Sequence, residues 1–127
     1  MNKDISIMIV DDNEPIRLVI RAILKNEGYK HFDEAEDGVS ALKILKSKKI
    51  DLIISDWNML GITGIELLLK VRADQEIAQT PFIIVSVEGG DVSMDRAFKS
   101  GANDFVSKPF TRSELIASVN RVMGQTA

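Results

Sequence analysis

Three acidic residues follow short apolar runs and could together bind a metal ion. Asp11 and Asp12 come directly after the apolar run 5–10, and Asp56 follows the run 52–54. Carboxylates gathered in one place repel each other by up to about 3 kcal/mol per pair at ~5 Å and an effective dielectric near 20. A divalent cation offsets this repulsion, and Mg²⁺ suits a site with few carboxylates because it keeps water ligands and binds phosphate oxygens. The acids therefore predict a Mg²⁺ site.

Asp56 also has the chemistry of a nucleophile, because a carboxylate can form an aspartyl phosphate. Ser86 and Lys108 each end a later apolar run. In phosphoryl transfer, negative charge on the equatorial oxygens can be stabilised by Mg²⁺, an ammonium and a hydroxyl. We expect this positioning to supply most of the rate. No histidine base is needed, and the only histidine, His31, is expected to be structural or exposed.

The apolar pattern predicts the elements that would position these side chains. Buried strands are expected at the four apolar runs 5–10, 52–54, 82–87 and 105–106, and a fifth, weakly marked strand is expected at 32–35. Between and after them, helical spacing of apolar residues predicts five helices, at about residues 16–24, 38–45, 63–69, 94–98 and 111–123. Thr63 and Thr111 each precede a glutamate by three residues, which is capping-box spacing. Gly28 and Gly101 are expected to end the first and fourth helices.

This strict alternation predicts an α/β fold of the (βα)5 type, a doubly wound five-stranded parallel sheet with helices on both faces. Functional groups in such sheets gather beyond the carboxyl ends of the strands. The three acids, the serine and the lysine lie at the ends of four different predicted strands, so the fold would bring them to one edge. That convergence is hard to assign to chance.

Each residue taken alone nevertheless has an ordinary structural explanation. Asp11, Asp12 and Asn13 could simply cap the following helix. Ser86 could only end a strand, and Lys108 could be a solvated surface lysine. These alternatives stay open at the level of single residues.

The composition argues against several other classes of protein. The length of 127 residues, with 45% hydrophobic and 28% charged side chains, suits one globular domain over 1–127. The net charge of −3, without a basic run, argues against a nucleic-acid partner. No cysteine is present, which removes disulfides and thiol chemistry. Without a signal peptide or a membrane-spanning run, we expect a cytoplasmic monomer with no membrane partner.

Five stretches of the sequence resemble the motifs of the response-regulator receiver family, and more narrowly of its chemotaxis branch. They occur in the family's order at residues 10–12, 34–38, 54–59, 85–88 and 108–110. The resemblance implies a flavodoxin-like fold with strand order 2-1-3-4-5. Because the chain stops soon after the fifth predicted helix, we expect a stand-alone receiver without an output domain.

The resemblance also implies a role for each residue of the site. Asp56 would be the phosphoacceptor, and Asp11 and Asp12 the metal-site acids. The backbone carbonyl of Asn58 would be a further Mg²⁺ ligand. Lys108 would contact the phosphate, aimed inward by a cis bond to the proline that follows it.

The resemblance also implies a conformational switch. The Ser86 hydroxyl would move toward the phosphate and Phe105 would fill the space behind it, changing the surface of the fourth helix, fifth strand and fifth helix. Phe105 replaces the tyrosine typical of the chemotaxis branch, and its alternative role is that of a plain core phenylalanine. Asn58 and Glu88, each two residues beyond a reacting group, would tune dephosphorylation and shorten the lifetime of the phosphoprotein.

The expected function is therefore that of a response regulator in a two-component phosphorelay. A sensor histidine kinase would be the donor, a protein such as a flagellar motor switch protein the effector, and a phosphatase could be a third partner. A phosphorelay shuttle or phosphate sink would use the same site. The chain would catalyse only its own phosphorylation and dephosphorylation. A small Mg²⁺-dependent phosphohydrolase is the rival from another class, although the Asp-x-Asp spacing of such hydrolases is absent after the first strand.

Overall fold

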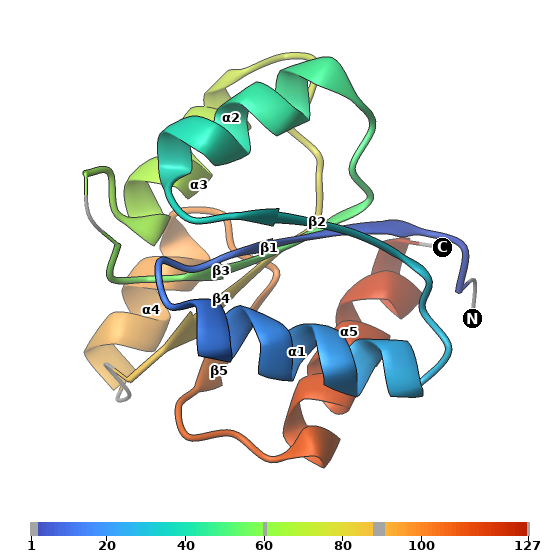
Figure 1. Cartoon of the computed structure of the whole chain (residues 1–127). Coiled ribbons are helices and arrows are strands. Elements are labelled where there is room, and N and C mark those ends of the chain that lie inside the picture. Colours follow the sequence, from blue (N-terminus) through green and yellow to red (C-terminus); the bar gives the residue numbers. More distant parts are fainter. Residues whose placement is uncertain (1–2, 60, 88–90, 127) are drawn as a thin grey trace.

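The computed structural model describes residues 3–59, 61–87 and 91–126, which form alternating strands and helices (Figure 1). In chain order the elements are β1 (Ser6–Val10), α1 (Glu14–Asn26), β2 (His31–Ala35), α2 (Gly38–Ser47), β3 (Leu52–Asp56), α3 (Gly64–Ala73), β4 (Phe82–Ser86), α4 (Asp91–Lys99), β5 (Asp104–Ser107) and α5 (Arg112–Thr126). The sequence pattern predicted all ten of these elements. In the described part of the chain, no helix combines the length and apolarity needed to cross a bilayer.

The five strands form one parallel sheet in the order β2-β1-β3-β4-β5. This confirms the predicted fold class and the strand order that the family resemblance implied. Helices α1 and α5 cover one face of the sheet, whereas α2, α3 and α4 cover the other (Figure 1). Strand order reverses between β1 and β3, so the carboxyl ends of these two strands are the expected place for a functional site.

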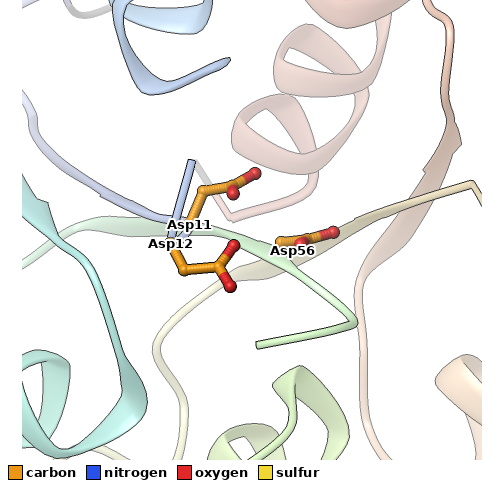
Figure 2. Close-up of side chains that lie close together, drawn as sticks. All are labelled: Asp11, Asp12 and Asp56. Carbon is orange, nitrogen blue, oxygen red and sulfur yellow. The ribbon is translucent and has the colours of Figure 1, made fainter. Parts of the chain in front are cut away.

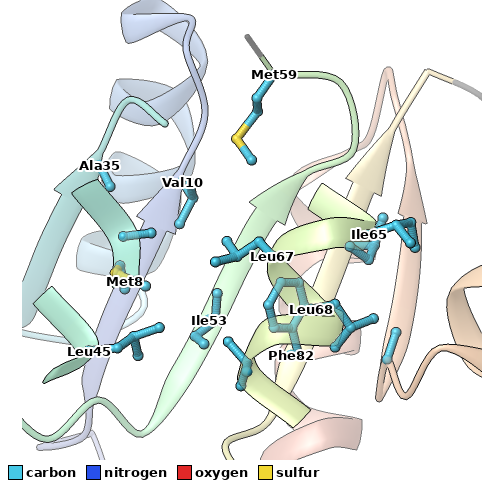
Figure 3. Close-up of a cluster of buried hydrophobic side chains, with 14 of the residues drawn as sticks. Met8, Val10, Ala35, Leu45, Ile53, Met59, Ile65, Leu67, Leu68 and Phe82 are labelled. Carbon is cyan, nitrogen blue, oxygen red and sulfur yellow. The ribbon is translucent and has the colours of Figure 1, made fainter. Parts of the chain in front are cut away.

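Each face of the sheet carries its own apolar core because side chains alternate along a strand. Met8 of β1 packs with Ile53 and Leu67 on the face covered by α2, α3 and α4 (Figure 3). Its neighbour Ile7 packs with Leu24 of α1 and other residues on the opposite face. All five side chains are fully buried, and each contributes about 1.5–3 kcal/mol of burial free energy. These two cores hold the strand ends in place.

The helix ends follow the capping signals of the sequence. The Thr63 hydroxyl accepts a hydrogen bond from the Glu66 amide at 3.1 Å, and the Thr63 amide donates to the Glu66 carboxylate at 3.0 Å, which completes the predicted capping box. Thr111 forms the same motif with Glu114. Helix α1 is capped by Asn13, whose side chain accepts from the amide at position 16. Asn13, and not Asp11 or Asp12, therefore fills the capping role that the sequence left open.

Candidate functional site

The three predicted acids converge at the carboxyl ends of β1 and β3 (Figure 2). Val10 pairs with Ser55 across these adjacent strands, so the next residues, Asp11 and Asp56, are neighbours. One carboxylate oxygen from each of Asp11, Asp12 and Asp56 lies within 4.8 Å of the other two. Asp11 is buried, Asp56 is partly buried and Asp12 is exposed. The acids thus form a cluster, called the acidic pocket below, whose Asp12 side is exposed to solvent.

The Lys108 ammonium joins this acidic pocket from the end of β5. Its Nζ donates to Asp11 Oδ2 and to Asp56 Oδ1, both at 3.1 Å, and only 14% of its side chain is exposed. The Lys108-Pro109 peptide bond is cis, as expected. The Lys108 amide also donates to the carbonyl of Ser86 at 2.8 Å, which ties it to β4. The alternative of a solvated surface lysine is therefore wrong.

The position of Lys108 corrects one expectation drawn from the sequence. Repulsion among the acids was expected to require a divalent cation, but an ammonium already bridges two of them. One ammonium against three carboxylates still leaves the pocket negative when all of the groups are ionised. Burial and the Asp11 charge raise the pKa of Asp56, although Lys108 opposes this shift. Burial alone would lower the pKa of Lys108, but the charges of Asp11 and Asp56 outweigh it and raise that pKa.

A pH-dependent stability difference should follow from the raised pKa of Asp56. Between its unfolded pKa, about 3.9, and its higher folded value, the folded chain binds more protons than the unfolded chain. Ionisation of Asp56 therefore lowers stability as the pH rises through this window. Without metal, Asp56→Asn should raise the urea midpoint near pH 7, and this gain should shrink below about pH 4. A variant less stable than wild type at neutral pH would contradict this charge balance.

The structure also describes two of the remaining predicted site residues, Ser86 and Asn58, near the ends of β4 and β3. Ser86 ends β4, is fully buried and pairs in register with Ser107 of β5. Asn58 is exposed in the segment after β3, two residues from Asp56. Glu88, expected to tune dephosphorylation, lies outside the described residues. His31 is the exposed first residue of β2, as expected of a residue without a catalytic role.

Phe105 is a buried residue of the core that lies under α2, α3 and α4. Its ring meets Trp57 edge to face, with centroids 6.3 Å apart and an interplanar angle of 76°. The guanidinium carbon of Arg96 on α4 lies 5.7 Å from the Trp57 ring centroid, within the range of a cation–π contact. Trp57 therefore links the segment after Asp56 to both α4 and β5. In this conformation the plain core role of Phe105 applies, and a switching role requires movement.

Sequence reasoning missed two arginines near the site. Arg17 of α1 donates to the backbone carbonyl of Asp11, and Arg96 of α4 stacks on Trp57. Neither arginine belongs to a recognisable motif. The available signal for Arg17 was its place four residues after the Asn13 cap, which puts it on the first turns of a helix that starts at the pocket.

The chemistry of the pocket fits a hard divalent cation. Its potential ligands are carboxylate oxygens that lie close enough together for one ion, and Mg²⁺ prefers such ligands. Asp12 is exposed, which leaves room for the water molecules that Mg²⁺ retains. Asp11, Asp12 and Asp56 are therefore the residues that would hold the ion.

Comparison with known proteins agrees with this geometry. The family model described as response regulator receiver domain matches residues 7–120. The chemotaxis protein CheY of Pseudomonas aeruginosa is 38% identical over 116 residues, which are 91% of this chain and 94% of that protein. The structure of the chemotaxis response regulator CheY4 of Vibrio cholerae superposes with a TM-score of 0.87 at 30% identity, covering 94% of this chain and 98% of that one.

A third similar protein bears on the metal site. It is the receiver domain of a sensor histidine kinase from Pseudomonas aeruginosa, solved with a magnesium ion coordinated in its active site cleft. It superposes with a TM-score of 0.85 at 26% identity and covers 95% of this chain and 98% of its own. With the sheet order, the acidic pocket and the family match in agreement, this chain belongs to the response regulator receiver domain family.

Proposed function

We propose that Asp56 accepts a phosphoryl group in a Mg²⁺-dependent reaction and that the chain is a switch in two-component signalling. The observation that carries this proposal is the position of the Asp56 carboxylate at the end of β3, beside two further acids and bonded to the Lys108 ammonium. The magnesium ion in the similar kinase receiver domain supports the choice of metal.

In the proposed step, a carboxylate oxygen of Asp56 bonds to phosphorus as the bond between phosphorus and the donor's leaving atom breaks. The electron pair stays with the donor, on an imidazole nitrogen of phosphohistidine or on a carboxylate oxygen of acetyl phosphate. Asp56 must be ionised to attack, and Lys108 favours that form by opposing the rise in its pKa. Positioning then supplies most of the rate.

The acids would have a second task, which is to hold the metal. Asp11 and Asp12, together with Asp56 and the backbone carbonyl of Asn58, would be the ligands that this chain provides. When bound, Mg²⁺ would supply positive charge to the phosphoryl oxygens. Because Asp11 also bonds Lys108 and the amide of residue 13, its carboxylate is held in place before any ligand arrives.

Phosphorylation would then change the groups around Asp56. It adds about −1.5 to −2 charge and strong acceptor oxygens, which the Lys108 ammonium and the Ser86 hydroxyl can meet. Movement of Ser86 would leave space for Phe105, and Phe105 contacts Trp57. The surface formed by α4, β5 and α5 would thereby shift between two arrangements.

The names of the relatives support a partner class for this switch. A sensor histidine kinase would donate the phosphoryl group, and a protein effector, such as a flagellar motor switch protein in chemotaxis, would bind the α4, β5 and α5 surface. Asn58 and Glu88 would tune loss of the phosphoryl group, which a phosphatase could accelerate. The chain would act on no substrate other than its own Asp56.

The test is incorporation of label from radiolabelled acetyl phosphate. With Mg²⁺, wild type should become labelled, while Asp56→Asn should remain at background because the nucleophile is gone. Removal of Mg²⁺ with a chelator should have the same effect in wild type. Asp33→Asn is the matched control, because Asp33 lies on β2 and pairs with Lys48. Full labelling of the Asp56→Asn protein would overturn the assignment of the acceptor.

A further inference from the structure

A buried guanidinium lies directly behind the acidic pocket. Arg17 of α1 has only 11% of its side chain exposed, and its Nη1 donates to the backbone carbonyl oxygen of Asp11 at 2.5 Å. That carbonyl belongs to the peptide bond that joins Asp11 to Asp12. The arginine therefore contacts the peptide group that joins the two acids.

Glu34 of β2 fixes the orientation of this arginine. Arg17 Nε donates to Glu34 Oε1 at 3.1 Å, which leaves Nη1 for the Asp11 carbonyl. Arg21, one turn further along α1, donates to the other oxygen of Glu34 at 3.0 Å and is 45% exposed. The two arginines thus share Glu34, but it is Arg17 that bonds the peptide between the acids.

Besides the bond between its carboxylate and Lys108, the Asp11 residue is held at three points. Its amide donates to the carbonyl of Ala35 on β2 at 3.1 Å, and its Oδ1 accepts from the amide of Asn13 at 2.9 Å. Arg17 holds the third point, the carbonyl. Since the chain leaves β1 here and turns into α1, loss of one restraint would let the Asp11-Asp12 peptide rotate. Rotation would turn the exposed Asp12 carboxylate away from Asp56.

We propose that Arg17 is a positioning residue for the metal site, which holds the Asp11-Asp12 peptide so that both carboxylates face Asp56, and that Glu34 orients Arg17 for this task. The inference rests on the proposed Mg²⁺ site and adds residues that touch neither the metal nor the phosphoryl group. The charge of Arg17 and its positioning role predict opposite effects on the affinity for Mg²⁺. As a cation near a cation site, it would weaken Mg²⁺ binding, whereas as a positioning group it strengthens it.

Titration of Mg²⁺ followed by Trp57 fluorescence separates these two effects. Arg17→Met should raise the dissociation constant about 10-fold, the lower end of what loss of an outer hydrogen-bonding partner costs a metal site. Arg21→Met, which removes the same charge from the same helix, should change the constant less than about 2-fold. Glu34→Gln keeps Arg17 and should raise the dissociation constant by an intermediate amount. Urea midpoints of all variants report whether they are folded.

A second measurement needs no metal. The amide nitrogen of Asp12 belongs to the peptide that Arg17 holds, so its NMR shift in metal-free protein should move in Arg17→Met and stay in Arg21→Met. Wild type that binds no Mg²⁺ would overturn the proposed function. Wild-type binding together with an unchanged or tighter constant in Arg17→Met would overturn the positioning role of Arg17 alone, as would an unmoved Asp12 shift.

Discussion

Lys108→Met is expected to lower the free energy of unfolding of the metal-free protein by about 3 kcal/mol, the lower end of the cost of removing one partner from a buried ion pair. The methionine would leave Asp11, 3% exposed, and Asp56, 11% exposed, side by side without the ammonium that now bonds both. Urea denaturation in the presence of a chelator measures this loss.

The same substitution should strengthen Mg²⁺ binding, because Lys108 and the metal compete for the same two carboxylates. Added Mg²⁺ should therefore restore more stability to the variant than it adds to wild type, through its higher affinity for the folded state. Lys99→Met is the control, since Lys99 forms an exposed pair with Asp95 on α4 and such pairs contribute little. Equal losses in the two variants, or weaker Mg²⁺ binding by Lys108→Met, would contradict this role.

The stability that Lys108 contributes to the folded protein should depend on pH in a definite direction. The folded pKa of Lys108 is raised, so its stabilising effect is complete below the unfolded value of about 10.4. The effect is lost as the pH rises through the folded value. The stability difference between wild type and Lys108→Met should therefore persist at neutral pH and decline only in strongly alkaline solution.

Gly64→Ala is the second substitution with a large expected effect, for a steric reason. A Cβ at Gly64 would overlap the carbonyl oxygen of Asp56 and would lie 3.0 Å from both the Asp56 carbonyl carbon and the Trp57 Cα. These are backbone atoms, which no side-chain rotation can move aside. Gly64 also donates from its amide to the Trp57 carbonyl at 2.7 Å. We expect a loss of about 3 kcal/mol in stability and weaker Mg²⁺ binding, because the clash pushes on the backbone of Asp56.

Gly61 provides the matched control for Gly64. It lies in the same connection but has φ +82°, and a Cβ there would meet nothing within 4 Å. Gly61→Ala should therefore cost only the backbone strain of a left-handed residue, about 1 kcal/mol. Urea midpoints and Mg²⁺ titrations of both variants make the comparison. If Gly64→Ala is no more damaging than Gly61→Ala, the close approach of α3 does not position Asp56.

The fold was predictable where local sequence rules decide the structure. Short apolar runs and helical spacing of apolar residues indicated the elements, and Thr63 and Thr111 indicated two helix starts, because capping depends on residues only three positions apart. The strand order came from family resemblance instead. An alternation of strands and helices fixes the parallel sheet but not which strand lies next to which.

The site was predictable in its members but not in its contacts. Asp11, Asp12, Asp56 and Lys108 were found because carboxyl ends of parallel strands meet at one edge. That Lys108 bonds two carboxylates depends on the path of a long side chain. Arg17 was not predicted for a related reason. Its partner is a backbone carbonyl, and because every residue has one, the partner cannot be identified from the sequence. Such contacts have no sequence signature of their own.

The hydrogen bonds of Lys108 also determine at which stage of synthesis the acidic pocket can be complete. The ammonium meets Asp11 across 97 positions of sequence and Asp56 across 52, and it directly follows β5, the last strand of the sheet to be synthesised. A nascent chain that ends at β4 already contains all three acids. It still lacks Lys108, whose ammonium bonds two of them. The acids and the ammonium that bonds two of them can therefore come together only after the last strand of the sheet has been synthesised.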